Sequence, residues 1–217
     1  MTIKKIMIYI FTLLILSGCT ESQSDTISDD TDDTLPAVFE SFDSSVTVSL
    51  DDDTIVISTT GVPNHESLYF PETHALYEAY DNVDFEYALE IDHLEPAAYT
   101  YRIPKDPTEA STKSETSFGP IGVALNGIPF YNQFNGAGAD LVPGDIEFNS
   151  FDQNNGHPQA QYIYHYHIEP LYLTSANAEA LVGFLLDGFP VYGPEENGQT
   201  AGDDTDTPDL DDNNGHD

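Results

Sequence analysis

The chain has 217 residues, with 5 Lys and Arg against 39 Asp and Glu, so its formal net charge is −34. This length fits one domain, or one domain with a tail, and an aromatic content of 12% can supply a core. The scarcity of basic residues excludes nucleic-acid binding, because phosphate contacts need clustered Lys and Arg. A single Cys excludes both a disulfide framework and a multi-Cys zinc site within one chain.

Residues 1–18 have the features of an export signal. Lys4 and Lys5 precede an apolar run at 6–16, and small residues follow it. The run is too short for a transmembrane helix, which needs about 20 apolar residues. We therefore expect residues 1–18 to be a signal peptide.

The end of this segment resembles the bacterial lipobox. It reads Leu-Ser-Gly-Cys at 16–19, and the last residue is the only Cys of the chain. We expect Cys19 to be lipidated and to attach the exported protein to a membrane of the cell envelope. Thr20, rather than Asp, follows Cys19, which in Gram-negative lipoproteins implies the outer membrane. Which side of that membrane the protein faces stays open.

The rest of the chain divides into a linker and one domain. Residues 19–43 are acidic and rich in Ser and Thr, which predicts a lipidated cysteine followed by a flexible linker. Residues 44–217 have short β-branched and aromatic segments between turn residues, so we predict a single, mainly β domain with at most one or two short helices. Strands are expected at 44–50, 53–60, 85–91 and 97–104, and a short helix at 176–186.

Part of this domain is an internal repeat. Val123–Tyr131 matches Phe184–Tyr192, and both segments carry an Asx-Gly pair typical of a β-hairpin turn. Asp152–His157 likewise matches Asp211–His216. We assign the two copies to 119–167 and 183–216. The second copy is incomplete, because the equivalent of the segment at 164–167 would follow residue 217, and we expect a truncation there.

Five motifs occur in order along the chain: Gly61–His65, Gly119–Phe130, Asn154–His157, Tyr164–His167 and Gly183–Pro194. Together they resemble the YHYH-domain family. The resemblance extends from about residue 44 to the end of the chain. It implies an exported or surface protein of unassigned activity, and it implies a further His-containing strand after the acidic segment. It therefore locates a site but leaves the function open.

The histidines of these motifs predict a metal site. His165 and His167 lie in an aromatic, β-branched segment that we interpret as a strand, where alternation places both on one face. His157 and His65 follow turn-forming residues that can fold them back toward this strand. With a carboxylate such as Asp152, these imidazoles suit copper or zinc.

Three further residues complete the expected site. Asn155 belongs to the turn before His157 and is expected to orient the ligands, as Asp152 also can. Tyr164 and Tyr166 are expected to pack on the opposite face of the strand. Whether such a site catalyses a reaction is not decided by the sequence.

Two alternatives stay open. The Tyr- and Asn-rich surface also fits a non-catalytic module that binds a glycan or a protein at the cell surface. The oxygen-rich segment at 203–214 offers carboxylates for calcium, although its glycine spacing excludes an EF-hand. Calcium is the less favoured metal.

Overall fold

The computed structural model describes residues 34–81, 94–159, 162–201, 210–211 and 215–216. Its elements belong to one unit, residues 33–217. The predicted signal peptide, Cys19, the strand expected at 85–91 and most of the acidic segment at 203–214 lie outside the described residues. Among the helices of the described part, none is long and apolar enough to span a membrane.

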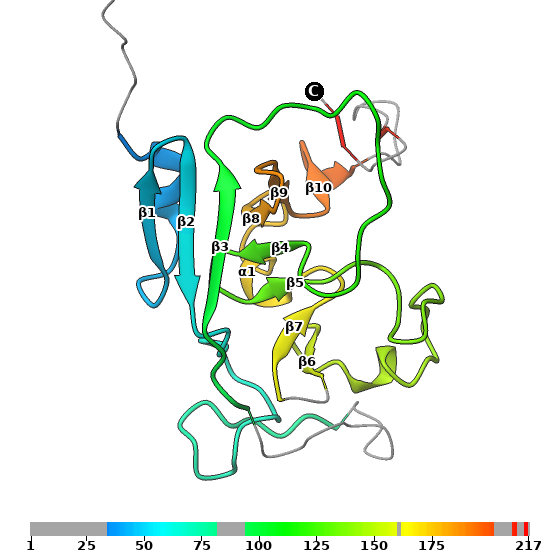
Figure 1. The fold of residues 1–217 in the computed structure, drawn as a ribbon. Helices are drawn as coiled ribbons and strands as arrows, with labels where there is room; N and C mark the ends of the chain where they lie inside the picture. Colours follow the sequence, from blue (N-terminus) through cyan, green and yellow to red (C-terminus); the bar gives the residue numbers. More distant parts are fainter. Residues whose placement is uncertain (1–33, 82–93, 160–161, 202–209, 212–214, 217) are drawn as a thin grey trace, which may run out of the picture. The chain divides into compact units, whose positions relative to one another are not determined.

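The fold is mainly β, as predicted, and its strands are short (Figure 1). The strands are β1 Thr47–Asp51, β2 Thr54–Thr59, β3 Tyr99–Pro104, β4 Gly122–Ala124, β5 Pro129–Phe130, β6 Gly156–Pro158, β7 Tyr164–Tyr166, β8 Leu181–Leu185, β9 Pro190–Tyr192, β10 Glu195–Glu196 and β11 Gln199–Thr200. The helical turns are η1 Ala37–Ser41, η2 Phe148–Ser150 and α1 Leu171–Thr174. Strands β2 and β3 lie inside the ranges expected at 53–60 and 97–104, and β1 lies in the range expected at 44–50 except for its last residue, Asp51.

The helix expected at 176–186 does not form. The α-helical turn α1 ends at Thr174, and Leu181–Leu185 is strand β8. Gly183 of β8 lies against β4 so closely that an added Cβ would overlap the carbonyl oxygen of Val123. Pairing inside the sheet therefore outweighs the helix propensity of the local sequence.

Strands β1, β2 and β3 form an antiparallel sheet in that order. Ile55 and Ile57 of β2 and Ile103 of β3 are fully buried, whereas their neighbours along each strand are more exposed. These isoleucines share a core with Val123 and Phe184 of the second sheet. The period-two pattern of the sequence thus marks the face by which this sheet contacts the rest of the unit.

Residues before the predicted start of the domain are also packed. Phe39 of η1 is only 4% exposed, and its ring stacks on that of Phe184 with centroids 4.4 Å apart. The stretch assigned to the linker, 19–43, is described from residue 34 onward, and this part contributes a side chain to the core.

The second sheet has six strands in the order β6-β7-β5-β4-β8-β9. Only β5 and β7 pair in parallel, through Phe130 and Tyr166. The two predicted hairpins are β4–β5 and β8–β9, and their turns contain Gly127 with φ 82° and Gly188 with φ 95°. Both values lie where glycine is favoured, which explains the Asx-Gly pairs of the sequence.

The two matching segments pair with each other in a locally two-fold symmetric way. Val123 of β4 pairs with Phe184 of β8, which is its equivalent in the other copy. A two-fold rotation that exchanges Val123 and Phe184 also exchanges the two flanking pairs, Gly122 with Leu185 and Ala124 with Gly183. The centre of this sheet is therefore a pairing of one hairpin with its own copy.

Candidate metal centre

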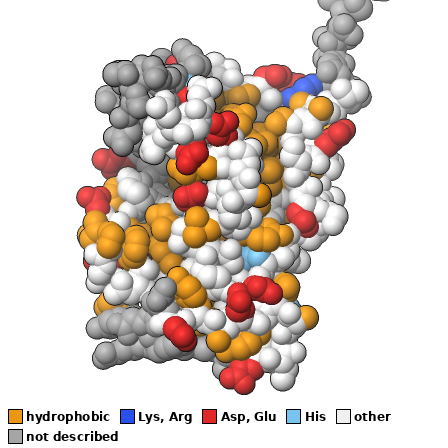
Figure 2. Space-filling model, turned by 180° about the vertical axis from the view of Figure 1, so that it is seen from behind, with side chains coloured by type: hydrophobic (Ala, Val, Ile, Leu, Met, Phe, Trp, Pro, Cys, Tyr) orange, Lys and Arg blue, Asp and Glu red, His pale blue; other side chains and the backbone are white. Residues whose placement is uncertain are grey.

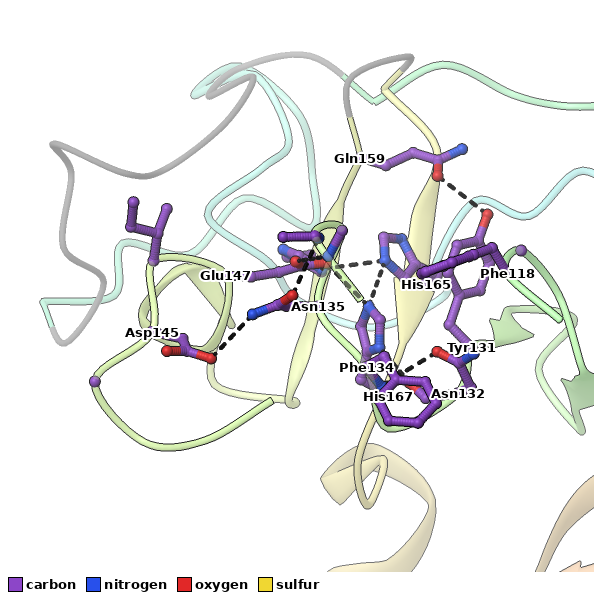
Figure 3. A pocket seen from close by; sticks show the side chains of 16 residues that line it. Phe118, Tyr131, Asn132, Phe134, Asn135, Asp145, Glu147, Gln159, His165 and His167 are labelled. Atoms are coloured by element: carbon purple, nitrogen blue, oxygen red, sulfur yellow. Dashed lines mark hydrogen bonds and ion pairs between the residues drawn. The ribbon is translucent and has the colours of Figure 1, made fainter. Parts of the chain in front are cut away.

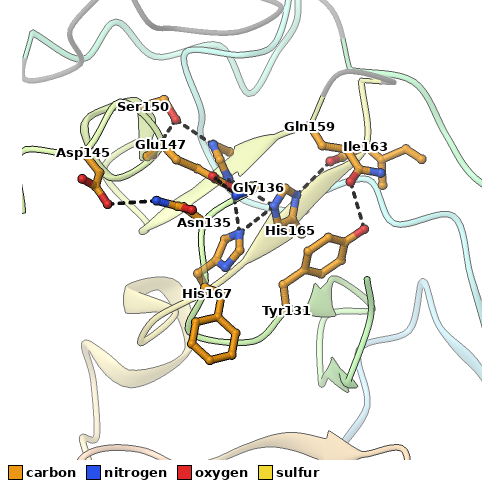
Figure 4. A network of polar contacts seen from close by, with 12 residues as sticks. Tyr131, Asn135, Gly136, Asp145, Glu147, Ser150, Gln159, Ile163, His165 and His167 are labelled. Carbon is orange, nitrogen blue, oxygen red and sulfur yellow. Dashed lines mark hydrogen bonds and ion pairs between the residues drawn. The ribbon is translucent and has the colours of Figure 1, made fainter. Parts of the chain in front are cut away.

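The candidate site lies on β6 and β7, at one edge of the six-stranded sheet. Antiparallel pairing places His157 on β6 opposite His165 on β7. His167 follows two residues later, on the same face as His165. The Nε2 atom of His165 lies 3.1 Å from that of His157 and 3.0 Å from that of His167. Three imidazole rings therefore converge on one point (Figure 4).

The other ring nitrogen of two of these histidines faces a backbone carbonyl. Nδ1 of His165 lies 3.2 Å from the oxygen of Ile163, and Nδ1 of His167 lies 2.7 Å from the oxygen of Asn132. A carbonyl oxygen can only accept a hydrogen bond, so each Nδ1 carries the proton and donates it. In the neutral form of such a ring, the Nε2 atom then carries a lone pair.

The third histidine has the same tautomer for a different reason. Nδ1 of His157 lies 2.6 Å from Oγ of Ser150. The Ser150 hydroxyl donates to the carbonyl oxygen of Glu147 at 2.7 Å, so its oxygen accepts the Nδ1 proton of His157. All three Nε2 lone pairs consequently face one another, an arrangement that repels unless a cation or a proton lies between them.

Burial keeps the rings of His157 and His165 neutral. His157 and His165 are each only 1% exposed. Burial and the neighbouring histidines lower the pKa of His165 to about 3, and they lower the pKa of His157 well below its usual value. Neutral imidazole is the form that binds a metal ion.

Glu147 supplies a carboxylate beside the three rings. Its Oε1 lies 3.3 Å from Nε2 of His167 and 3.8 Å from Nε2 of His157, while its Oε2 accepts the backbone N–H of Gly136 at 2.6 Å. Burial acts to raise the pKa of Glu147, but the cationic form of the neighbouring histidines and the backbone N–H of Gly136 act against it, and the pKa is lowered overall. The group is therefore ionised at neutral pH.

These four side chains have the dimensions of a transition-metal site. One ligand atom from each lies within 4.8 Å of all the others. Two nitrogens bound to one tetrahedral zinc ion at about 2.05 Å are about 3.3 Å apart, close to the Nε2 separations around His165. Each Nδ1 also has the oxygen partner that metal-bound histidines usually have. The cluster of Glu147, His157, His165 and His167 can thus hold one ion, and we call it the His-Glu cluster.

His65, which the sequence also proposed as a ligand, lies elsewhere. Its Nε2 is 2.8 Å from the hydroxyl of Tyr166, and its ring contacts that of Tyr164. Both tyrosines project from β7 on the face opposite to His165 and His167, as strand alternation predicts. The structure therefore does not bring His65 to the His-Glu cluster.

Asp152 lies on the same opposite side. Its Oδ2 accepts the hydroxyls of Ser67 at 2.5 Å and Tyr164 at 2.8 Å, and its Oδ1 accepts the N–H groups of Asn154 and Gly156. Burial raises the pKa of this carboxyl, and the hydrogen bonds act against that change. Its Oδ1 holds the turn before His157, and its Oδ2 is used by Ser67 and Tyr164, so Asp152 positions this histidine and does not face the cluster.

Asn155 belongs to the same turn, as expected. It has φ 62°, a left-handed conformation that Asn tolerates better than other side chains. Its side-chain Nδ2 donates to the carbonyl oxygen of Glu169 at 2.9 Å. The turn is thereby tied to the segment that follows β7.

A cavity of about 650 Å³ adjoins the cluster. Figure 3 shows the side chains of His165 and His167 at this cavity, together with aromatic side chains and Glu147. The strands supply the histidines, whereas the long loop between β5 and β6 supplies Glu147 and much of the remaining lining. One side of the cluster is therefore buried against the sheet, and its other side faces the cavity.

Glu147 and Ser150 were not predicted from the sequence. The chain has 39 acidic residues, so none of them stands out as a ligand, and Asp152 was favoured only because it precedes His157. No short motif marks Glu147. Its place depends on the path of the loop after β5, which brings η2 back against β6.

The family comparison agrees with the motifs. The family model described as YHYH protein matches residues 100–214, a range that contains the whole His-Glu cluster and excludes His65. Comparisons with curated proteins and with solved structures give no match. The family match covers more than half of the chain, and the segment Tyr164–His167 carries the Tyr-His-Tyr-His sequence itself. The chain belongs to the YHYH protein family.

Proposed function

We propose that this protein binds one transition-metal ion, copper or zinc, at the His-Glu cluster. The observation that carries the proposal is the convergence of three Nε2 atoms, each on a ring whose Nδ1 faces an oxygen partner. Imidazole nitrogen suits Cu(II) and Zn(II). Calcium takes oxygen ligands, so it does not fit this cluster.

The ligand arrangement also favours an accessible ion. The three histidines lie on paired strands, and a cavity adjoins them. A metal held by a few protein ligands beside a cavity can take a further ligand from that side. The proposed site is therefore one at which a small molecule can reach the metal.

The decisive experiment measures metal content. The protein is purified, freed of metal, and titrated with zinc and with copper, beside the double variant His165→Ala/His167→Ala. We expect near-stoichiometric binding by the wild type and none by the folded double variant. The matched control is His74→Ala, because His74 is an exposed histidine that stacks on Phe70 outside the cluster.

Circular dichroism of each variant checks that it is folded. A folded wild type that binds neither metal would overturn the proposal. Equal binding by wild type and double variant would place the metal elsewhere in the chain and would overturn it as well.

We also propose that the protein is exported and anchored to the outer membrane through lipidated Cys19. The support is the basic segment, apolar run and lipobox-like end of residues 1–19. Expression of the full chain with radiolabelled palmitate should label the wild type and leave Cys19→Ala unlabelled. Recovery of unlabelled wild-type protein in the soluble fraction would refute the anchor.

A further inference from the structure

The cavity beside the His-Glu cluster indicates the kind of ligand that reaches the metal. We propose that it holds an uncharged, ring-bearing molecule that presents a single oxygen or nitrogen donor to the ion. The inference rests on the proposed metal binding and adds the class of ligand. The volume of the cavity, about 650 Å³, lies within the range of small-molecule sites.

Hydrophobic side chains surround the space. Phe118 is 66% exposed and Ile146 is 53% exposed, although both line the cavity, and Phe134 lines it as well. Exposed apolar side chains of this size gathered around one hollow are typical of a surface that a ligand covers. The ring of Tyr131 lies on that of His165, with centroids 4.0 Å apart. An incoming ring would thus meet aromatic side chains beside the metal ligands.

The amide side chains of the cavity already have partners within the protein. Asn132 donates to the carbonyl oxygen of Ser117 and accepts the N–H of Phe134. Asn135 accepts two backbone N–H groups and donates to Asp145. A ligand with many hydroxyl groups would have to break these bonds or lose its own hydrogen bonds to water.

The hydroxyl of Tyr131 is also used, since it donates to Gln159 at 3.1 Å. These groups contribute to the shape of the cavity more than to polar recognition of a ligand. The geometry therefore disfavours a glycan, one of the alternatives that the sequence left open, and favours contact with apolar rings.

The charges of the lining argue in the same direction. Asp145 and Glu147 line the cavity, and no Lys or Arg is found among the described residues around it. An anionic ligand would find attraction only at the metal ion and repulsion from these carboxylates. An uncharged ligand avoids that repulsion and needs one donor atom toward the metal.

The test uses zinc-loaded protein and the uncharged fluorescent dye N-phenyl-1-naphthylamine, whose emission rises in an apolar site. We expect saturable binding of one dye molecule, displaced by 4-ethylphenol and not by glucose. Phe118→Ala should weaken dye binding about tenfold, because it removes an aromatic contact at the cavity. The matched control is Tyr192→Ala, since Tyr192 is 58% exposed and does not line the cavity.

Zinc content, measured in the same samples, separates the two proposals. Protein that holds zinc and does not bind the dye overturns the ligand inference and leaves metal binding intact. Protein that holds no zinc overturns both. Dye affinity that Phe118→Ala leaves unchanged, or displacement by glucose, overturns the ligand inference alone. Tighter binding of 4-ethylphenol by zinc-loaded than by metal-free protein supports the donor-to-metal contact.

Discussion

The protons on the Nδ1 atoms decide what the three histidines can do. Because Ile163 and Asn132 present carbonyl oxygens, His165 and His167 cannot turn their Nε2–H tautomers toward the cluster without losing a hydrogen bond. A histidine-lined polar layer could instead pair Nε2–H groups with acceptors. The tautomers that these contacts favour leave three acceptors facing one another, an arrangement that a cation between them stabilises.

Glu147 allows a test that keeps the local hydrogen bonds. In Glu147→Gln the amide oxygen can still accept the N–H of Gly136, whereas the anionic ligand is lost. We expect zinc affinity to fall at least about tenfold, with little change in unfolding temperature. Competition with a chelating dye measures this affinity. The control is Glu72→Gln, an exposed acid remote from the cluster, and equal losses in both variants would contradict the assignment of Glu147 as a ligand.

Acid should destabilise the metal-free protein through the same histidines. The pKa of His165 is about 3 in the folded protein against 6.5 for an ordinary histidine, and that of His157 is lowered too. The unfolded chain therefore binds more protons in this interval, so the free energy of unfolding falls as the pH drops from about 6.5 toward 3.

Urea unfolding at several pH values measures this dependence. His165→Asn should flatten it, and His74→Asn should not. Burial raises the pKa of Asp152, so above pH 3.8 this group makes the free energy of unfolding rise as the pH drops. This effect is the same in wild type and variants. An identical pH dependence in wild type and His165→Asn would contradict the neutral, buried state of His165.

At the scale of elements, the turn before β6 sets the position of His157. The backbone N–H of Asp152 donates to the carbonyl oxygen of Gly156, and its carboxylate accepts the N–H of Gly156 in return. The copy at the end of the chain has the same two bonds, between Asp211 and Gly215. The same pair of Asp–Gly hydrogen bonds thus occurs twice, once beside the His-Glu cluster.

The two glycines of these turns provide a matched pair of variants. A Cβ added at Gly156 would overlap the ring of Tyr164, whereas one added at Gly215 would have ordinary contact with Asp211 at 3.7 Å. We expect Gly156→Ala to lower the free energy of unfolding by about 1–3 kcal/mol and to weaken zinc binding. Gly215→Ala should stay within about 0.5 kcal/mol of the wild type. Chemical denaturation compares them, and similar losses in both would refute the role of the Tyr164 contact.

Local patterns identified most of the described strands and three of the four cluster residues. The alternation in β7 separates His165 and His167 from the two tyrosines, and Asx-Gly pairs mark both hairpins. Glu147 was beyond such reasoning, because its position depends on contacts between a loop and a distant strand. His65 was misjudged for a related reason: nothing local indicates which face of β7 the segment after β2 covers.

At the scale of the whole molecule, the net charge of −34 dominates the electrostatics. Acidic side chains are scattered over the face shown in Figure 2, and basic ones are few. The exposed ion pair of Arg102 with Asp51 offsets little of this repulsion. The acidic side chains are closer together in the folded state than in the unfolded chain, so screening by salt should reduce their mutual repulsion mainly in the folded state.

We expect the unfolding temperature to rise as sodium chloride increases from about 0.05 M to about 1 M, because the screening length shortens over this range. Differential scanning calorimetry of the metal-free protein measures the change. Choline chloride at equal ionic strength serves as the control for specific sodium binding. A fall in unfolding temperature with both salts would show that attractive ion pairs outweigh the repulsion.

The self-paired centre of the six-stranded sheet has an evolutionary consequence. A hairpin that pairs with its own copy around Val123 and Phe184 has the symmetry of a dimer built from two identical short chains. Gene duplication and fusion of such a chain would produce this arrangement directly.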